Sequence, residues 1–292
     1  MKIEYNFNLK DYNSYQIESV CKRAYFPDNE NDILDLYNAK KEYILLGGGY
    51  NIIFSQEYYD NDFIIFNGNF NTLKIDTNSS VISAEAGATI LDVSEIAKKN
   101  SLKGVEFFYD IPSSVGGAVV MNAGTKEGET QNILKKVRYL DLVDMVIKEK
   151  IKEDLELEYR NSFFQKQKDK IILKVWFQLK PGVKSNIRHM MDMSKERRWA
   201  KQPREFPNSG SVFKRPPGAF VGPMIDELGL KGYKIGGAQV SEKHANFIIN
   251  LGNASALDIE NIITYIQKVV FEKKNIQLLR EIKIIGEKLG SQ

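Results

Sequence analysis

The stretch YDIPSSVGGAVVMNAG, residues 109–124, contains a proline, two serines and a pair of glycines in close succession. Ile111-Pro112 predicts an extended entry, because the residue before a proline is pushed out of the helical region. Ser113 and Ser114 follow directly and can cap a short apolar helix. The stretch therefore predicts an extended segment that turns into a helix.

Two glycines, Gly116 and Gly117, fall in the early turns of that predicted helix. Glycine destabilises a helix interior, so a pair of them suggests that something comes close to the backbone. The partner could be a pyrophosphate seated on free N–H groups at the helix start. It could equally be a neighbouring strand in a tight packing contact, with no ligand. These residues alone leave both interpretations open.

A second glycine cluster lies upstream, in EYILLGGGYNIIF at residues 42–54. An apolar strand, Tyr43–Leu46, runs into Gly47-Gly48-Gly49, and Tyr50 and Asn51 follow. Consecutive glycines leaving a strand offer bare N–H groups to an anion. The pattern is neither the dinucleotide fingerprint nor a Walker loop. Two separate anion-binding loops suit a diphosphate held between them.

Four further motifs occur in order after these loops. They are YRNSFF (159–164), PNSGSVFKRP (207–216), GGAQVSEKHANFIIN (236–250) and LREIKIIG (279–286). With the two glycine loops, they make the chain resemble the UDP-N-acetylenolpyruvoylglucosamine reductases, flavoenzymes of peptidoglycan precursor synthesis. The resemblance covers nearly the whole chain. It implies a cytoplasmic oxidoreductase that acts on a C=C bond and serves cell-wall biogenesis.

The family's architecture implies an α+β fold. A two-lobed FAD-binding module of the vanillyl-alcohol-oxidase/PCMH type would be followed by a C-terminal α+β substrate-binding domain. Breaks near residues 60 and 182 predict one lobe at 1–60, a second at 61–182 and the substrate-binding domain at 183–292, with Pro181-Gly182 as the linker.

The implied reaction reduces UDP-N-acetylglucosamine enolpyruvate to UDP-N-acetylmuramate, with FAD as hydride carrier and NADPH as reductant. Arg160 matches the family's arginine, which stabilises charge on the substrate carboxylate. Ser211 matches its proton donor, and Glu281 its second charge-handling residue. Taken singly, these would be an ion-pairing arginine, a turn serine and a surface glutamate.

The resemblance also implies binding residues. Lys201 and Arg215 are candidates for the substrate diphosphate, and FAD would be held without a covalent bond. The implied cofactor-binding residues are Gly47, Gly48, Gly49, Tyr50, Asn51, Ile111, Pro112, Ser113, Ser114, Gly116, Gly117 and Gly124.

Three departures from the family pattern leave individual FAD contacts open. Ser113 stands where glycine is usual, Tyr50 where serine is usual, and Asn13-Ser14-Tyr15 is a loose match. Between Phe164 and Ile171, residues 165–170 leave no room for the tyrosine-bearing loop of one branch of the family. The chain resembles the shorter branch.

The composition limits the classes of partner and ligand that we expect the protein to bind. With 41 basic and 38 acidic residues the formal charge is only +3, which implies no bulk affinity for nucleic acid. The one cysteine, Cys21, excludes an internal disulfide and predicts a small buried residue, and the two histidines cannot build a His/Cys metal cluster. No run approaches the ~18 apolar residues of a membrane span. We therefore expect a soluble cytoplasmic protein without membrane insertion.

Hydrophobic periodicity and turn residues predict the remaining elements. The strands expected are Lys22–Phe26, Lys74–Asp76, Val81–Glu85, Val137–Leu142, Met145–Lys150, Ile171–Leu179, Asn246–Asn250 and Ile276–Ile285. The helices expected are Asn31–Lys41, Ile90–Asn100 capped by Thr89, the polar 184–202, Ala219–Leu228 and one opened by Ser255 with Asp258. Leu91, Ile96 and Ala97 are expected to face inward, as is a stripe from Leu257 to Val270.

Several interpretations stay open. The polar helix at 184–202 fits either a solvated face or part of a phosphate site. His244 fits structural support or a hydrogen bond near the nucleotide. Two other functions compete with the reductase: another FAD-dependent oxidoreductase of the same fold, and a non-catalytic nucleotide-sugar or flavin-binding protein. The joint presence of Arg160, Ser211 and Glu281 argues against both.

Overall fold

The computed structural model describes residues 1–286, which form two compact units. The first comprises Met1–Tyr5, Arg23–Gly48 and Asn61–Glu196. The second comprises Asn6–Lys22, Gly49–Asp60 and the chain from Arg197 onward. The three-part division predicted from the sequence stays a prediction, and its last range ends in residues that lie outside the described part.

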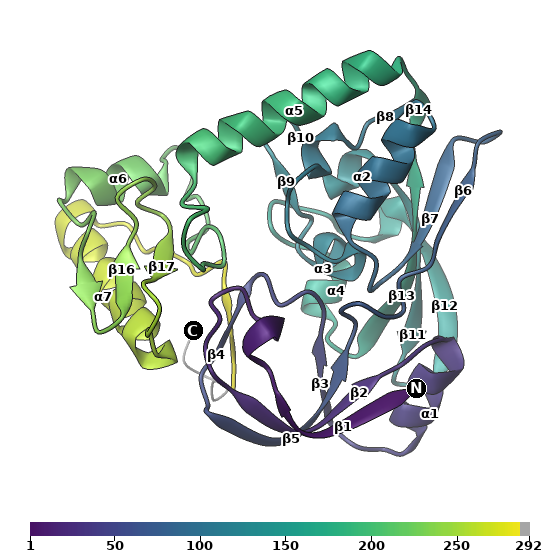
Figure 1. The fold of residues 1–292 in the computed structure, drawn as a ribbon, viewed down its shortest axis with the longest axis horizontal. Coiled ribbons are helices and arrows are strands. Elements are labelled where there is room, and N and C mark those ends of the chain that lie inside the picture. Colours follow the sequence, from purple (N-terminus) through teal and green to yellow (C-terminus); the bar gives the residue numbers. More distant parts are fainter. Residues whose placement is uncertain (287–292) are drawn as a thin grey trace. The chain divides into compact units, whose positions relative to one another are not determined.

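A five-stranded antiparallel sheet in the order β12-β11-β13-β7-β6 organises the first unit (Figure 1). Its strands are β6 (Leu73–Asp76), β7 (Val81–Glu85), β11 (Leu134–Asp141), β12 (Val146–Ile151) and β13 (Lys170–Gln178). All five were predicted: β7 has the predicted bounds, and the other four have ends displaced by up to three residues. The β6–β7 turn is stabilised by Asp76, whose carboxylate accepts the N–H groups of Asn78 and Ser79.

Three helices, α2 (Ile90–Lys99), α3 (Val115–Val120) and α4 (Phe163–Lys166), pack against β7 and β13. Thr89 caps α2 by accepting the Asp92 N–H (3.0 Å), as predicted. Leu91 was wrongly expected to face inward and is 40% exposed. The buried stripe of α2 runs through Ile90, Val93, Ser94 and Ala97 at helical spacing, so Leu91 lies outside it.

A four-stranded sheet in the order β1-β2-β5-β3 contains the glycine-cluster strand. Its strands are β1 (Lys2–Asn8), β2 (Val20–Phe26), β3 (Tyr43–Leu46) and β5 (Tyr58–Ile65), and α1 (Glu30–Asn38) connects β2 to β3. β3 has the predicted bounds, and the β2 and α1 predictions are confirmed with shifted ends. Cys21 is buried in β2, also as predicted.

The predicted linker at Pro181-Gly182 is hydrogen-bonded within the first unit. Strand β14 (Lys180–Pro181) pairs with β8 (Leu102–Lys103), and the Gly182 N–H donates to the Ser101 carbonyl (2.8 Å). The polar helix α5 (Lys184–Lys201) follows, as expected. A second short pair, β9 (Gly124–Thr125) with β10 (Gly128–Glu129), lies just after α3.

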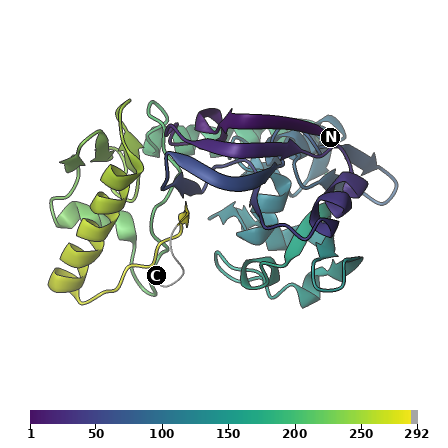
Figure 2. The same cartoon turned by 90° about the horizontal axis from the view of Figure 1, so that it is seen from below.

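The second unit contains the antiparallel sheet β15-β16-β17 and the parallel pair β4–β18. Helix α7, yellow in Figure 2, packs against β15, β16 and α6. The bounds are β4 (Ile52–Phe54), α6 (Val221–Glu227), β15 (Lys234–Ile235), β16 (Ala238–Val240), β17 (Ile248–Asn250), α7 (Ala256–Lys274) and β18 (Lys283–Ile285). Ser255 and Asp258 form the predicted capping box of α7.

Two expectations for this unit are wrong in part. Leu257 is 65% exposed, because it lies off the buried stripe that begins at Ala256 and Ile259. The last strand is restricted to Lys283–Ile285, whereas Ile276–Ile285 was predicted. The Leu278 carbonyl in the missing portion accepts the Gln267 side-chain amide of α7 (2.9 Å), so a side chain takes the bond that a neighbouring strand would have made.

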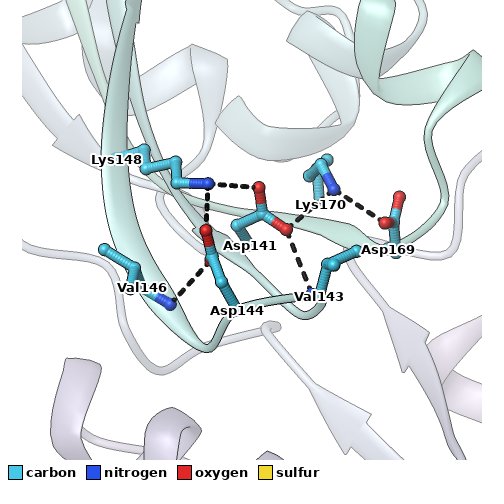
Figure 3. Close-up of polar contacts among 7 residues, drawn as sticks. All are labelled: Asp141, Val143, Asp144, Val146, Lys148, Asp169 and Lys170. Atoms are coloured by element: carbon cyan, nitrogen blue, oxygen red, sulfur yellow. Dashed lines mark hydrogen bonds and ion pairs between the residues drawn. The ribbon is translucent and has the colours of Figure 1, made fainter.

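A charged cluster closes the β11–β12 hairpin (Figure 3). The Asp141 carboxylate, nearly buried, accepts the ammonium groups of Lys148 and Lys170, both at 2.8 Å. These hydrogen bonds hold the pKa of Asp141 well below its usual range. The cluster links β11, β12 and β13 at one end of the sheet.

Candidate active site

The start of α3 uses its own backbone donors within the protein. The N–H groups of Val115 and Gly116 donate to the carbonyls of Ala88 (2.7 Å) and Ala86 (2.9 Å). The Gly117 N–H donates to Ser114 Oγ (3.2 Å), which confirms Ser114 as the helix cap. The idea that free N–H groups here seat a pyrophosphate is therefore wrong for these three donors.

The glycines of α3 serve a close packing contact. A Cβ added at Gly116 would lie 3.1 Å from Ala86 Cβ and 3.3 Å from the Ala86 carbonyl oxygen. The helix thus approaches the end of β7 more closely than a side chain would allow. Of the two interpretations open at the sequence level, tight packing describes Gly116.

The upstream glycine loop has the opposite character. Within residues 1–286, the backbone N–H groups of Gly47, Gly48, Gly49 and Tyr50 make no hydrogen bond. Gly49 has a φ of 70°, and the loop leaves β3 with its donors unused. Successive unbonded N–H groups in a glycine turn form the concave donor array that binds anions.

The two loops meet at one point. A Cβ added at Gly47 would lie only 2.7 Å from Ser114 Oγ, so the bare backbone of Gly47 faces the cap of α3. The Ser113 Oγ donates to the Ser114 carbonyl (3.0 Å). The Ser114 hydroxyl thus lies against the backbone of a loop whose N–H groups are unused by the described residues. An array of unused N–H groups fits the diphosphate of a dinucleotide cofactor.

Other predicted cofactor residues have structural contacts. The Ile111 N–H donates to the Phe108 carbonyl (3.0 Å), and Pro112 is exposed beside it. The Asn51 side chain donates to the Glu281 carbonyl (3.1 Å), while its own carbonyl accepts the Lys283 N–H (3.0 Å). Asn51 thereby joins the end of the glycine loop to β18.

Arg160 is fixed against the segment that follows α3. Its Nη2 donates to the Gly124 carbonyl (3.0 Å), its Nη1 approaches the Asn122 carbonyl (3.4 Å), and the guanidinium lies 5.1 Å from the Tyr159 ring centre. Arg160 has a φ of 53°, a strained value for a residue with a side chain. Strain of this kind concentrates at functional positions.

Ser211 and Glu281 lie on neighbouring segments of the second unit. The Glu281 N–H donates to the Val212 carbonyl (2.8 Å), and Phe213 forms an isolated bridge with Arg280. Ser211 is half-buried and follows Gly210, which has a φ of 78°. In the described part of the chain, the Ser211 hydroxyl has no hydrogen-bond partner. It is therefore available to a ligand.

Lys201 and Arg215 are exposed cations of the second unit. Lys201 ends α5, and the Arg215 guanidinium lies 5.4 Å from the Phe220 ring centre. His244 makes one structural contact, in which its Nδ1 accepts the Asn246 N–H (3.2 Å). Burial, together with the nearby charges of Lys231 and Lys201, lowers the pKa of His244.

Sequence reasoning missed two contacts that support this region. The Asn246 side chain bonds to the backbone of Phe213, and the Ser14 hydroxyl contacts the Ser209 hydroxyl (2.8 Å). Asn246 stands in the motif KHANF, where only the histidine drew attention. An asparagine within an apolar run was the available signal, because a buried amide needs hydrogen-bond partners.

Within residues 1–286, no helix is long and apolar enough to span a membrane, and no group of three or more His, Cys, Asp or Glu side chains could hold a metal ion. Only residues 167–169 separate α4 from β13, which confirms the short connection predicted there.

Two protein-family models match the chain. One, described as an FAD binding domain, matches residues 22–146, and the other, UDP-N-acetylenolpyruvoylglucosamine reductase, C-terminal domain, matches residues 202–285. Together with the mixed helices and strands, they confirm the predicted α+β class, an FAD-binding module followed by a C-terminal reductase domain.

Full-length relatives carry the same description. The chain is 42% identical to UDP-N-acetylenolpyruvoylglucosamine reductase of Francisella tularensis, covering 94% of this chain and 97% of that protein. It is 38% identical to the reductase of Caldanaerobacter subterraneus, covering 98% and 95%. A crystal structure of UDP-N-acetylenolpyruvylglucosamine reductase from Thermus caldophilus superimposes with a TM-score of 0.82 at 29% identity, covering 97% of this chain and 98% of that one.

Proposed function

The chain belongs to the UDP-N-acetylenolpyruvoylglucosamine reductase family, and we propose from that premise how its residues divide the work of the reaction. The protein is an FAD-dependent oxidoreductase of peptidoglycan synthesis. It reduces the enolpyruvyl ether of UDP-N-acetylglucosamine enolpyruvate to the lactyl ether of UDP-N-acetylmuramate. We place this reaction in the cytoplasm, with NADPH as the reductant and with neither nucleic acid nor membrane insertion involved.

The glycine loop is proposed to hold FAD. We propose that the N–H groups of Gly47, Gly48, Gly49 and Tyr50 supply donors to its diphosphate and that Ser113 and Ser114 also contribute to the site, since the Ser114 hydroxyl lies against Gly47. When bound, FAD accepts hydride from NADPH and then supplies hydride to the substrate. We propose that Asn51, Ile111, Pro112, Gly116, Gly117 and Gly124 line this site. FAD binding is proposed to be non-covalent.

Hydride addition at the vinyl carbon drives electron density into the adjoining carboxylate. Arg160 is proposed to stabilise that charge, because a guanidinium is always protonated and its orientation is fixed by the carbonyls of Gly124 and Asn122. Preorganised donors of this kind stabilise a developing charge without the cost of reorientation. Glu281 is proposed as the second group that handles this charge.

Ser211 is proposed to protonate the remaining carbon. The observation that carries this assignment is that Ser211 is half-buried and its hydroxyl has no hydrogen-bond partner among the described residues, while the next residue, Val212, accepts the Glu281 N–H. A serine hydroxyl is a weak acid, so it can donate only to a strongly basic carbon. Such a carbon exists only after hydride transfer. Lys201 and Arg215 are proposed to bind the substrate diphosphate.

Stopped-flow absorbance of the flavin separates the two half-reactions. Ser211→Ala should leave reduction by NADPH near normal and slow reoxidation by the enolpyruvyl substrate by about 10²–10⁴-fold. Ser209→Ala removes a hydroxyl from the same turn and should change reoxidation by less than ten-fold. If Ser211→Ala slows reduction and spares reoxidation, Ser211 is not the proton donor.

A further inference from the structure

The segment that carries Ser211 is held by one residue, Asn246, in the turn that precedes β17. The Phe213 N–H donates to Asn246 Oδ1 (3.0 Å), and Asn246 Nδ2 donates back to the Phe213 carbonyl (2.9 Å). The Val212 N–H donates to the Asn246 main-chain carbonyl (2.9 Å). One residue therefore makes three hydrogen bonds to the two residues that follow Ser211.

These bonds are shielded from water. Asn246 is 7% exposed and Phe213 1% exposed. A buried backbone group that loses its partner cannot turn to solvent, so removing the amide would leave both polar groups of Phe213 unsatisfied. The Asn246 side chain and the Phe213 backbone therefore have one favourable arrangement, and this arrangement fixes the backbone of residues 212–213.

The same backbone sets the position of Ser211 relative to Glu281. The Val212 carbonyl accepts the Glu281 N–H, while the Val212 N–H donates to the Asn246 carbonyl, so Val212 joins the two segments. The Ser211 hydroxyl makes no hydrogen bond of its own to a described residue, so no polar contact of its side chain restrains it. Its location depends on the residues that follow it.

We infer that Asn246 is a positioning residue for the proton donor Ser211, acting through the backbone of Val212 and Phe213. The inference rests on the proposed role of Ser211. A displacement of a reacting group by about 1 Å can cost 10²-fold in rate, so loss of the amide should impair proton donation although Asn246 itself does not contact the substrate.

The test compares Asn246→Ala with Asn250→Ala in the holoenzyme. Asn250 ends β17, is 3% exposed, and bonds through its side chain to the backbone of Tyr15, Gly252 and Ala254 and not to residues 211–213. Both variants should lower Tm. Only Asn246→Ala should slow flavin reoxidation, by about 10–100-fold, while reduction by NADPH stays within two-fold.

Asn246→Asp keeps the test decisive if the alanine variant does not fold. A protonated carboxyl can accept from the Phe213 N–H and donate to its carbonyl, as the amide does, whereas a carboxylate cannot donate. Burial should raise the pKa of this Asp above about 3.9. Reoxidation by Asn246→Asp, relative to wild type at each pH, should therefore recover as the pH falls. Dividing the reoxidation rate of the variant by that of wild type at each pH removes the contribution of neighbouring His244 to the pH dependence.

Amide hydrogen exchange of the holoenzyme gives a readout that does not depend on activity. The Phe213 amide should exchange faster in Asn246→Ala than in wild type and unchanged in Asn250→Ala. Reoxidation equal to wild type in Asn246→Ala, an equal loss in Asn250→Ala, or no pH-dependent recovery in Asn246→Asp would overturn the inference. Ser211→Ala is measured in parallel, because normal reoxidation there would instead refute the proposed function.

Discussion

The two glycine clusters look alike in sequence but differ in what their backbones contact. The cluster at the start of α3 donates its N–H groups to Ala88, Ala86 and Ser114, and packs against the end of β7. The loop after β3 leaves its N–H groups unused by the described residues. Both clusters come close to other protein atoms, at Gly47 and Gly49 as at Gly116, so the difference between them lies in whether their N–H groups are already hydrogen-bonded.

The largest effect is expected where the glycine loop itself meets protein. A Cβ added at Gly49 would lie 1.9 Å from the Tyr12 carbonyl oxygen, at a φ of 70°. Gly49→Ala should therefore lower the free energy of unfolding by at least about 3 kcal/mol, more than the 1–2 kcal/mol of left-handed backbone alone. Urea denaturation measures this. A loss below about 1 kcal/mol would show that Tyr12 does not fix the shape of the loop.

Lys201 and Arg215 should contribute to substrate binding, whereas the glycine loop should bind FAD. Lys201→Ala and Arg215→Ala should each cost about 1.5–3 kcal/mol of substrate binding, because a charged hydrogen bond to phosphate is lost. Diphosphate contacts are alike in ground and transition states, so the loss should appear in KM and not in kcat. Steady-state kinetics and FAD titration check both parts. Weakened FAD binding in either variant would mean that the glycine loop does not hold the cofactor diphosphate by itself.

A matched pair of alanine substitutions separates the two clusters directly. Gly47→Ala should weaken FAD affinity about ten-fold, or ~1.4 kcal/mol, because its Cβ would lie 2.7 Å from Ser114 Oγ and would displace the loop that carries the unused N–H groups. Gly116→Ala should lower the free energy of unfolding of the flavin-free protein by about 1–3 kcal/mol through overpacking against Ala86. Its FAD affinity should change less than three-fold. Weaker FAD binding in Gly116→Ala together with unchanged FAD binding in Gly47→Ala would contradict the comparison of the two glycine clusters.

The smallest effect should come from the Asp141 cluster, which is remote from both glycine clusters in sequence. Asp141→Asn should lower Tm by about 2–4 °C at pH 7 without changing FAD affinity, so it controls for unspecific destabilisation. The folded pKa of Asp141 is depressed by Lys148 and Lys170. The wild-type advantage should be complete above the unfolded pKa of about 3.9 and disappear as the pH falls through the lower folded value. Thermal melts from pH 7 to pH 2 test this, because the advantage should shrink below about pH 3.9; an advantage at pH 2 as large as at pH 7 would exclude the ion pairs as its source.

Much of the fold could be predicted because local signals were strong. Alternation and polar turns identified the strands of the large sheet, and Thr89, Ser114 and Ser255 marked helix starts through their caps. The final strand was overpredicted, since an apolar run cannot reveal that Gln267 occupies the Leu278 carbonyl. Leu91 and Leu257 were placed inward because apolar character alone does not fix the angle around a helix.

The site was predicted less completely than the fold. The motif that contains Arg160 was recognised, yet nothing in it indicates that the guanidinium binds the Gly124 and Asn122 carbonyls. Asn246 was overlooked because its role depends on Phe213, which lies far away in sequence. Contacts between distant segments are set by tertiary packing, and single-sequence patterns do not record them.

Amide hydrogen exchange with and without FAD tests the central claim most directly. Adding FAD to the flavin-free protein should slow exchange of the Gly47, Gly48, Gly49 and Tyr50 amides by at least about ten-fold, since each unused donor gains a phosphate partner. The amides of Val115, Gly116 and Gly117 should already be protected and should change little. Bound FAD with freely exchanging amides at 47–50 would contradict the account.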